Sequence, residues 1–148
     1  MKISAKGRYA LASTVYMAAC YGGGEYITVI SISEKLGISK IYLEQVFSLL
    51  KRGDVVNSVK GAQGGYRLSR PPSEITAYDV LSAVETSLFE KAEDTVLDCV
   101  PEIEEAVKEL VFERADSVLA AALGNATLAM LAGNAEKRKA NTGNMFYI

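Results

Sequence analysis

A mainly α-helical fold with one small β-hairpin is predicted by three features of this 148-residue chain. Two short segments with apolar residues at helical spacing are separated by a glycine. Two short runs rich in β-branched and aromatic residues then flank a glycine-rich turn. A long amphipathic segment follows in the second half of the chain. In this order, the features predict a winged helix-turn-helix domain over residues 1–86, followed by a long additional helix.

The helix-turn-helix is predicted over residues 28–52. The apolar residues that would form its packed seam are Ile32, Leu36, Ile38, Leu43, Val46, Phe47 and Leu50. Gly37 allows a sharp turn after the first helix, because glycine tolerates positive φ. Ser39 suits the N-cap of the second helix, where its hydroxyl would accept a hydrogen bond from a backbone amide. This second helix, over about residues 39–52, would present its polar N-terminal face to a DNA major groove.

The hairpin is interpreted as a wing. Its strands are expected over residues 55–59 and 66–68, and its tip carries Lys60, Gln63 and several glycines. Glycine suits the positive backbone angles of a tight turn and the close approach of a sugar–phosphate edge. A nucleotide-phosphate loop is a rival interpretation of these glycines. It is excluded because no Gly-Lys-Ser/Thr follows and no strand–loop–helix order is present.

Two further helices complete the predicted winged domain. The first covers about residues 4–21 and ends at three consecutive glycines. The second covers about residues 76–86, with Thr76 as its N-cap and Asp79 in its first turn. Residues 87–100 break the pattern and are expected to form a loop.

A dimerisation helix is expected within residues 101–133. Pro101 can occupy the first position of a helix. Apolar residues then recur mostly at intervals of three and four as far as Leu123, with Arg114 interrupting the stripe. A small winged domain has little need of such a helix, whereas regulators that bind two-fold half-sites need a partner subunit. The alternative is a helix that folds back on its own domain. Residues 134–148 are expected to form a flexible C-terminal tail.

Net charge separates the two halves of the chain. Residues 1–70 contain 10 lysines and arginines against 4 acidic residues, a net charge of +6. Residues 71–148 contain 6 against 14, a net charge of −8. A positive face in the half with the helix-turn-helix favours binding to the phosphates of double-stranded DNA, and the acidic half keeps the rest of the molecule away from this polyanion. Chance segregation of solvated charge is the alternative.

Nine residues are candidates for contact with DNA. They are Lys6, Arg8, Ser39, Lys40, Tyr42, Glu44, Gln45, Lys60 and Gln63. Lysine and arginine can bind phosphate oxygens, glutamine can bridge adenine, and glutamate can accept from cytosine. Solvated surface charge is the alternative role for Lys6, Arg8 and Glu44. Half-buried packing is the alternative role for Tyr42.

Composition excludes several other classes of function. The chain has no histidine, which rules out histidine-based catalysis and a histidine-containing zinc site, and its two cysteines cannot form a four-thiolate site. No paired catalytic constellation is evident, so an enzyme is not expected. No apolar run is long enough to cross a bilayer and the N-terminus does not resemble a signal peptide, so a cytoplasmic protein is expected. Cys20 is interpreted as a small core residue rather than a reactive thiol.

Four stretches of the sequence carry a resemblance to a known family. They are SAKGRY at 4–9, ISEKLGISKIYLEQ at 32–45, SVKGAQGGYRL at 58–68 and ITAYDVLSAVE at 75–85. The chain resembles the bacterial winged-helix family that contains IscR, NsrR and CymR, the Rrf2 family. The resemblance implies a homodimeric repressor whose recognition helix and wing bind a palindromic operator. It also implies groove-facing positions for Tyr42 and Glu44. Lys60 stands where the family has a wing arginine, and lysine keeps the charge but lacks the planar fork.

The same resemblance bears on cofactors. Sensing branches of the family hold an iron–sulfur cluster on three cysteines in the loop before the long helix, where this chain has only Cys99. We therefore expect no cofactor, and the chain is most similar to the cluster-free branch typified by CymR, a repressor of cysteine-metabolism genes. One alternative is an iron–sulfur- or redox-responsive regulator of the same family, with Cys99 as a relic ligand or modified thiol. Another is a winged module that binds protein rather than DNA.

The apolar end of the chain also carries a resemblance. Phe146, Tyr147 and Ile148 are similar to the terminus of CymR and to the isoleucine-ended tail by which serine acetyltransferase binds O-acetylserine sulfhydrylase. The resemblance implies O-acetylserine sulfhydrylase as a partner, because a free terminal carboxylate suits capture in a pocket of amide donors. Coverage of the protein's own surface is the alternative.

Overall fold

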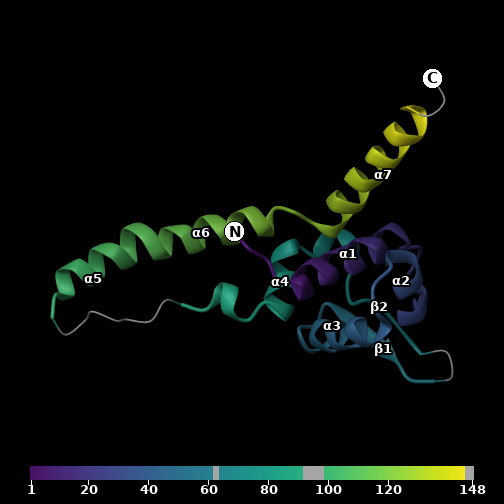
Figure 1. Cartoon of the computed structure of the whole chain (residues 1–148), viewed down its shortest axis with the longest axis horizontal. Coiled ribbons are helices and arrows are strands. Elements are labelled where there is room, and N and C mark those ends of the chain that lie inside the picture. The colour runs from purple at the N-terminus through teal and green to yellow at the C-terminus, as the bar shows by residue number, and fades with distance from the viewer. Residues whose placement is uncertain (62–63, 92–98, 146–148) are drawn as a thin grey trace.

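The computed structural model of the chain describes residues 1–61, 64–91 and 99–145 (Figure 1). Its helices are α1 (Ala5–Ala19), α2 (Val29–Leu36), α3 (Lys40–Arg52), α4 (Ala77–Val84), α5 (Pro101–Val107), α6 (Glu113–Gly124) and α7 (Leu128–Met145). Strands β1 (Val56–Val59) and β2 (Gly65–Leu68) form an antiparallel hairpin. Short 3-10 turns occupy Pro72–Glu74 and Ser87–Phe89, and a π-helical segment, Lys108–Phe112, joins α5 to α6. The predicted mainly α fold with a hairpin wing is confirmed.

The helix-turn-helix packs around the predicted seam. Five seam residues have no exposed surface, namely Ile32, Leu43, Val46, Phe47 and Leu50. Leu36 and Ile38 are partly buried against them. Gly37 ends α2 in the left-handed region, with φ at 66°, which explains why the turn needs a glycine. Helices α1 and α4 pack against α3 and complete the core.

One local expectation is wrong. Ser39 occupies the N-cap of α3 as predicted, but its side chain makes no capping hydrogen bond. The capping hydroxyl lies one helix earlier, where Thr28 accepts a hydrogen bond from the Ser31 amide at 3.2 Å. The Ser39 side chain is instead exposed at the start of α3.

The wing is anchored to the body by a contact that the sequence did not predict. Val56 pairs with Leu68 and Val59 with Gly65, so β2 begins one residue earlier than expected. The amide of Ile27 donates to the Tyr66 carbonyl and the Tyr66 amide donates to the Ile27 carbonyl, both at 2.8 Å. A Cβ on Gly65 would lie 2.7 Å from the Ile27 carbonyl oxygen. At this position the missing side chain therefore serves the contact with Ile27 rather than an approach of DNA.

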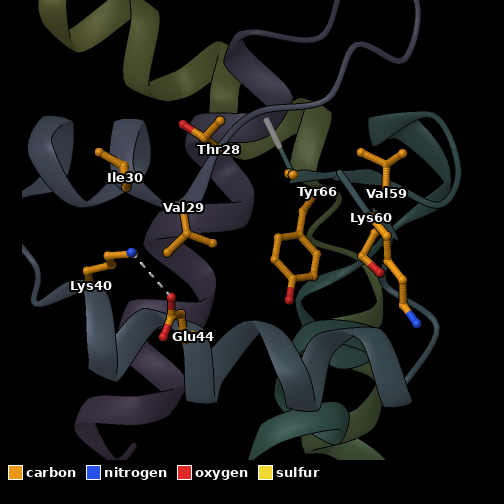
Figure 2. Close-up of a pocket in the computed structure, with 11 residues that line it drawn as sticks. Thr28, Val29, Ile30, Lys40, Glu44, Val59, Lys60 and Tyr66 are labelled. Atoms are coloured by element: carbon orange, nitrogen blue, oxygen red, sulfur yellow. Dashed lines mark ion pairs between the residues drawn. The ribbon is translucent and has the colours of Figure 1, made fainter. Parts of the chain in front are cut away.

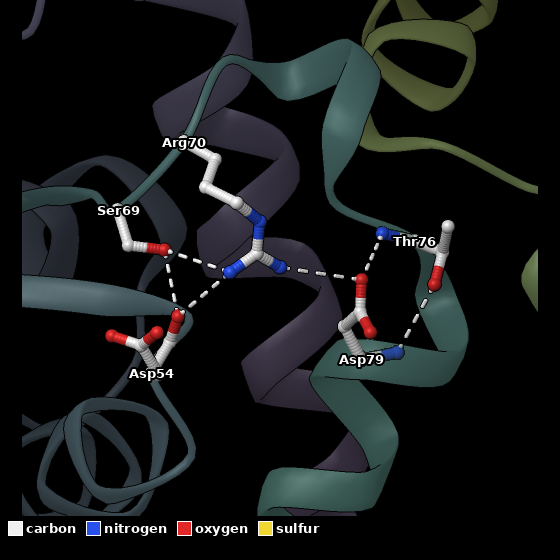
Figure 3. Close-up of polar contacts among 5 residues, drawn as sticks. All are labelled: Asp54, Ser69, Arg70, Thr76 and Asp79. Atoms are coloured by element: carbon white, nitrogen blue, oxygen red, sulfur yellow. Dashed lines mark hydrogen bonds and ion pairs between the residues drawn. The ribbon is translucent and has the colours of Figure 1, made fainter.

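A polar network joins the end of the wing to the start of α4 (Figure 3). Thr76 accepts from the Asp79 amide at 3.2 Å, and Asp79 Oδ2 accepts from the Thr76 amide at 2.9 Å, so the predicted cap is confirmed as a capping box. Arg70 donates to Asp79 Oδ2 at 3.5 Å and to the carbonyl oxygen of Asp54 at 3.2 Å. Ser69 donates to the same carbonyl oxygen at 2.7 Å. These bonds hold together the end of the wing, Asp54 just after α3, and the start of α4.

Replacing Asp79 by alanine should lower the free energy of unfolding by about 1–2 kcal/mol, because it removes half of the capping box and the partner of Arg70. Urea denaturation at one fixed protein concentration measures this loss. Asp79→Asn is the matched control, since asparagine can still accept from the Thr76 amide but carries no charge for Arg70. We expect a smaller loss for this variant. An alanine variant as stable as the parent would contradict the assignment.

The second half of the chain begins with the predicted long helix. Segments α5, the π-helical turn and α6 follow one another without a break from Pro101 to Gly124. Figure 1 shows them as a rod that extends away from the winged body. We call this element the α5–α6 rod. The π-helical turn in its middle was not predicted; such turns insert one extra residue into a helix.

A helix occupies most of the segment 134–148 that the sequence predicts as a flexible tail. Helix α7 continues to Met145, and residues 146–148 lie outside the described part of the chain. Its start is tied to the start of α4, because the Leu128 amide donates to the Ile75 carbonyl and the Ala77 amide to the Ala126 carbonyl, both at 2.8 Å. Leu128 is fully buried, and α7 packs against α1. Within the described residues, none of the helices is both long and apolar enough to span a membrane.

Candidate nucleic-acid interface

Helix α3 buries one side and exposes the other. Its apolar seam faces the core, whereas Lys40, Ile41, Glu44, Gln45 and Ser48 are exposed. Lys40 Nζ lies 3.7 Å from Glu44 Oε1, one turn later, and both side chains are about half exposed, at 52% and 54%. An exposed pair of this kind contributes only about 0.2–1 kcal/mol, so a competing phosphate or base can displace either partner at little cost.

A hollow of about 530 Å³ separates α3 from the wing (Figure 2). Its lining residues are Thr28, Val29, Ile30, Lys40, Glu44, Ser58, Val59, Lys60, Gly64, Gly65 and Tyr66. In Figure 2, Lys40 and Glu44 stand on one side and Tyr66 and Lys60 on the other. We call it the helix–wing hollow. A duplex whose major groove holds α3 and whose minor groove meets the wing must pass a sugar–phosphate strand between them, and two lysines flank that path.

A second hollow of about 450 Å³ lies between α1 and the turn of the helix-turn-helix. We call it the turn hollow; it is lined by Ala5, Tyr9, Gly37, Ile38, Ser39, Ile41, Tyr42 and Gln45. The Tyr9 ring meets the Tyr42 ring edge to face, with 5.3 Å between centroids and an interplanar angle of 85°. Tyr42 is partly buried against the core. Packing by Tyr9 therefore sets the orientation of Tyr42 on the exposed side of α3.

The first turn of α1 is held in place by α4. The Glu85 carboxylate accepts hydrogen bonds from the amide and the hydroxyl of Ser4. A Cβ on Gly7 would lie 2.4 Å from Glu85 Oε1, so glycine is needed for this approach. The same turn carries Lys6, which is half-buried, and Arg8, which is exposed. Neither lines the helix–wing hollow or the turn hollow, but both lie on the helix whose residues Ala5 and Tyr9 border the turn hollow.

The candidate residues from the sequence fall into three groups. Lys40, Glu44 and Lys60 meet at the helix–wing hollow, and Ser39, Tyr42 and Gln45 meet at the turn hollow. Lys6 and Arg8 stand apart on α1. Gln63 lies outside the described residues, as do Phe146, Tyr147 and Ile148. Their roles in binding remain predictions.

Sequence reasoning missed several residues that line the hollows. Tyr66 appears in the sequence prediction as part of a strand and of a family motif, and Tyr9 as part of a family motif, but neither was a binding candidate, although both place an aromatic ring beside a hollow. Ile41 was passed over because it lies between two candidate positions. Its signal was its phase: an apolar residue two positions before Leu43 falls off the buried seam of α3. Thr28 and Ile30 gave no comparable signal, because only the fold brings them to the wing.

The cysteines provide few metal donors. Cys20 and Cys99 are both exposed, so the interpretation of Cys20 as a core residue is wrong. Cys20 caps the end of α1, where its hydrogen bond to Tyr16 raises the pKa of that phenol above its usual value. Within residues 1–61, 64–91 and 99–145, no group of three or more cysteine or acidic side chains is arranged to hold a metal ion. Iron–sulfur clusters need several thiolates or imidazoles, and this donor set does not fit one.

Comparison with known proteins matches this architecture. The model of the family Rrf2, described as "Iron-dependent Transcriptional regulator", matches residues 3–134. IscR of Cereibacter sphaeroides is 40% identical over 89 residues, and IscR of Aliivibrio salmonicida is 44% identical over 88. These alignments cover 60% of this chain and 57% and 52% of those proteins, so the chain spans about half the length of the curated relatives it matches. All are named as transcriptional regulators, not enzymes.

Two solved structures extend the match to the whole fold. CymR of B. subtilis superimposes with a TM-score of 0.63 and 33% identity, covering 90% of this chain and 98% of that one. IscR of T. potens gives a TM-score of 0.61 and 31% identity, covering 93% and 90%. The family description names iron, but the donor set of the described residues does not fit a cluster. The chain belongs to the Rrf2 family of winged-helix transcriptional regulators.

Proposed function

We propose that the chain is a homodimeric repressor that binds a palindromic DNA operator through α3 and the wing. The observation that carries the proposal is the helix–wing hollow, where the exposed polar side of α3 faces Lys60 of the wing. Phosphate binding by Lys40 and Lys60 would position the duplex, and Glu44 and Gln45 would contact base edges. The net charge of +6 over residues 1–70 supports this orientation.

The homodimer is supported by the α5–α6 rod. The rod exposes six large apolar side chains, Ile103, Val107, Leu110, Val111, Phe112 and Val118, at between 37% and 66% of their surface. Ile103, Val107, Leu110 and Val111 recur at the spacing of one helix side, and Glu102, Glu105 and Glu109 fall on the other side. An apolar stripe of this length is unusual on a monomer. A second copy would cover it and would present two winged domains with two-fold symmetry, which is why the operator is expected to be palindromic.

The regulated genes are proposed to belong to cysteine or sulfur metabolism. The support is the similarity to CymR, which its solved structure describes as the global cysteine regulator of B. subtilis. The proposed partner O-acetylserine sulfhydrylase would bind Phe146, Tyr147 and Ile148, which lie outside the described residues. Helix α7, which leads to them, projects away from the winged body in Figure 1.

Selection of duplexes from a random pool by the purified protein tests the proposal. We expect a palindromic consensus whose affinity falls steeply with the logarithm of salt concentration, because bound lysines release counterions from the phosphates. A winged module that binds protein instead would yield no consensus and no salt slope. A consensus without two-fold symmetry would reject the dimeric arrangement while keeping DNA binding.

Replacing Gln45 by alanine should weaken binding to the consensus by about 1–3 kcal/mol for each half-site and relax the preference at one base pair in each half-site. Fluorescence anisotropy with single-base variants of the consensus measures both effects. Lys60→Ala is the contrasting control, since loss of a phosphate contact in each subunit should weaken all sequences about equally and reduce the salt slope of the dimer by about two. Uniform weakening by Gln45→Ala would contradict its assignment to base recognition.

A further inference from the structure

We propose that Ile41 determines specificity by contacting the C5-methyl group of a thymine in the major groove. This inference rests on the proposed function. Ile41 is 71% exposed, the largest exposed fraction among the bulky apolar side chains of the described helices. It lies in the first turn of α3, on the side opposite the buried seam.

A single exposed apolar residue is common on protein surfaces. Ile41 differs from such a residue by its position. It lines the turn hollow together with Tyr42 and Gln45. It also lines a shallower hollow of about 530 Å³ along α3, with Glu44, Gln45, Ser48 and Leu49. Ile41 therefore borders both of these hollows on the exposed side of α3, and Gln45 borders both with it.

The chemistry of the major groove identifies the partner. Among the four bases, only thymine presents an apolar group there, its C5-methyl, beside hydrogen-bonding atoms. Isoleucine can neither donate nor accept a hydrogen bond, so a methyl group is the feature that it can distinguish. The polar residues around it, Lys40, Glu44 and Gln45, suit the phosphate and base-edge atoms on either side. The basic charge of this half of the chain favours DNA as the occupant over an apolar surface of another protein.

The spacing of Ile41 and Gln45 limits where the thymine lies. Residues four apart are neighbours on one helix side, with a rise of about 5.4 Å per turn. Base pairs follow one another at about 3.4 Å. If Gln45 bridges an adenine, the thymine contacted by Ile41 should lie within about two base-pair steps of it. Each half-site is therefore expected to contain a thymine close to that adenine.

The test removes one methyl group from the DNA and, separately, replaces the isoleucine of the protein by alanine. Each thymine of the selected consensus is replaced in turn by deoxyuridine, which pairs identically but lacks the methyl group. We expect the full-length protein to lose roughly threefold to tenfold in affinity at one thymine per half-site, the effect of burying about one methyl group. Ile41→Ala should bind the thymine duplex more weakly by a larger factor, because it removes the contact in both half-sites, and it should no longer distinguish thymine from deoxyuridine.

Ile30→Ala is the matched control, because it removes the same side chain from an exposed position at the start of α2. It should keep the discrimination at that thymine whatever its overall affinity. The salt slope should be the same for the parent and for Ile41→Ala, because no charge has changed. Circular dichroism checks that both variants fold. We expect them to fold because Ile41 and Ile30 are exposed and contribute little to the core.

Three results would overturn the inference. The parent protein could be insensitive to every deoxyuridine replacement, or Ile41→Ala could keep full discrimination. Ile41→Ala could also shift the protein to monomer in sedimentation experiments, which would show that Ile41 covers a contact between subunits. A parent protein that binds no duplex at low ionic strength would instead reject the proposed function, and this inference with it.

Discussion

Replacing Leu110 by glutamate should leave the protein monomeric and should reduce its affinity for the consensus duplex by at least roughly 100-fold. Leu110 is 62% exposed near the middle of the apolar stripe of the α5–α6 rod. In a two-fold dimer the substitution introduces one carboxylate from each subunit, and burial of an unpaired carboxylate costs several kcal/mol. Sedimentation velocity measures the assembly state, and fluorescence anisotropy measures the affinity for DNA.

A charge change on the other side of the rod provides the control. Glu105→Lys alters the net charge by two units but falls on the acidic side, away from the stripe. It should remain dimeric and should bind DNA at least as well as the parent, since it removes negative charge. A Leu110→Glu variant that stays dimeric would show that the rod is covered in another way, or that subunits meet elsewhere.

Replacing Phe47 by alanine should lower the free energy of unfolding by about 3–5 kcal/mol, enough to unfold much of the protein at moderate temperature. Phe47 has no exposed surface, and its ring lies 4.8 Å from the ring of Tyr66, between centroids. The side chain thus joins the buried side of α3 to the base of the wing. Thermal unfolding followed by circular dichroism measures the loss.

Tyr66→Phe separates packing from binding at the same contact. It keeps the ring that packs on Phe47 but removes the hydroxyl of a residue that lines the helix–wing hollow. We expect stability close to that of the parent and weaker binding to DNA. If Tyr66→Phe were as unstable as Phe47→Ala, the hydroxyl would have a structural role that the hydrogen bonds of the described residues do not explain.

Features with local sequence signals were predicted well. The seam of the helix-turn-helix, the turn at Gly37 and the cap at Thr76 each depend on residues within a few positions of one another, and all were confirmed. The wing was located to within one residue. The exposed side of α3 followed directly from the phase of its buried side, which is why most candidate residues for DNA contact could be chosen before the fold was known.

Features that depend on distant contacts were not predicted. Helix α7 has few apolar residues after Leu131, so its pattern resembles a polar tail. Its start is instead held by the hydrogen bond from the Leu128 amide to the Ile75 carbonyl, by that from the Ala77 amide to the Ala126 carbonyl just before the helix, and by burial of Leu128. The bridge between Ile27 and Tyr66 likewise consists of backbone hydrogen bonds between residues far apart in the sequence, so no local pattern predicts it. Two smaller errors concern single residues. Ser39 occupies the N-cap of α3 but its side chain makes no capping hydrogen bond, and Cys20 lies near apolar residues in the sequence but is exposed in the fold.

If Lys40 and Glu44 contact DNA as proposed, the ion pair between them affects how the protein rejects an incorrect DNA sequence. In the protein without DNA, the Glu44 carboxylate lies beside Lys40, at the position that a phosphate oxygen of the DNA would otherwise occupy. A duplex that offers Glu44 no hydrogen-bond donor must compete for the lysine against this substitute, whereas one with a cytosine amino group in reach draws the carboxylate away. Lys40 would therefore bind the phosphates of a duplex with the correct base more strongly than those of a duplex without it. The bias is small, about 0.2–1 kcal/mol for each subunit, but in a two-fold assembly it applies twice.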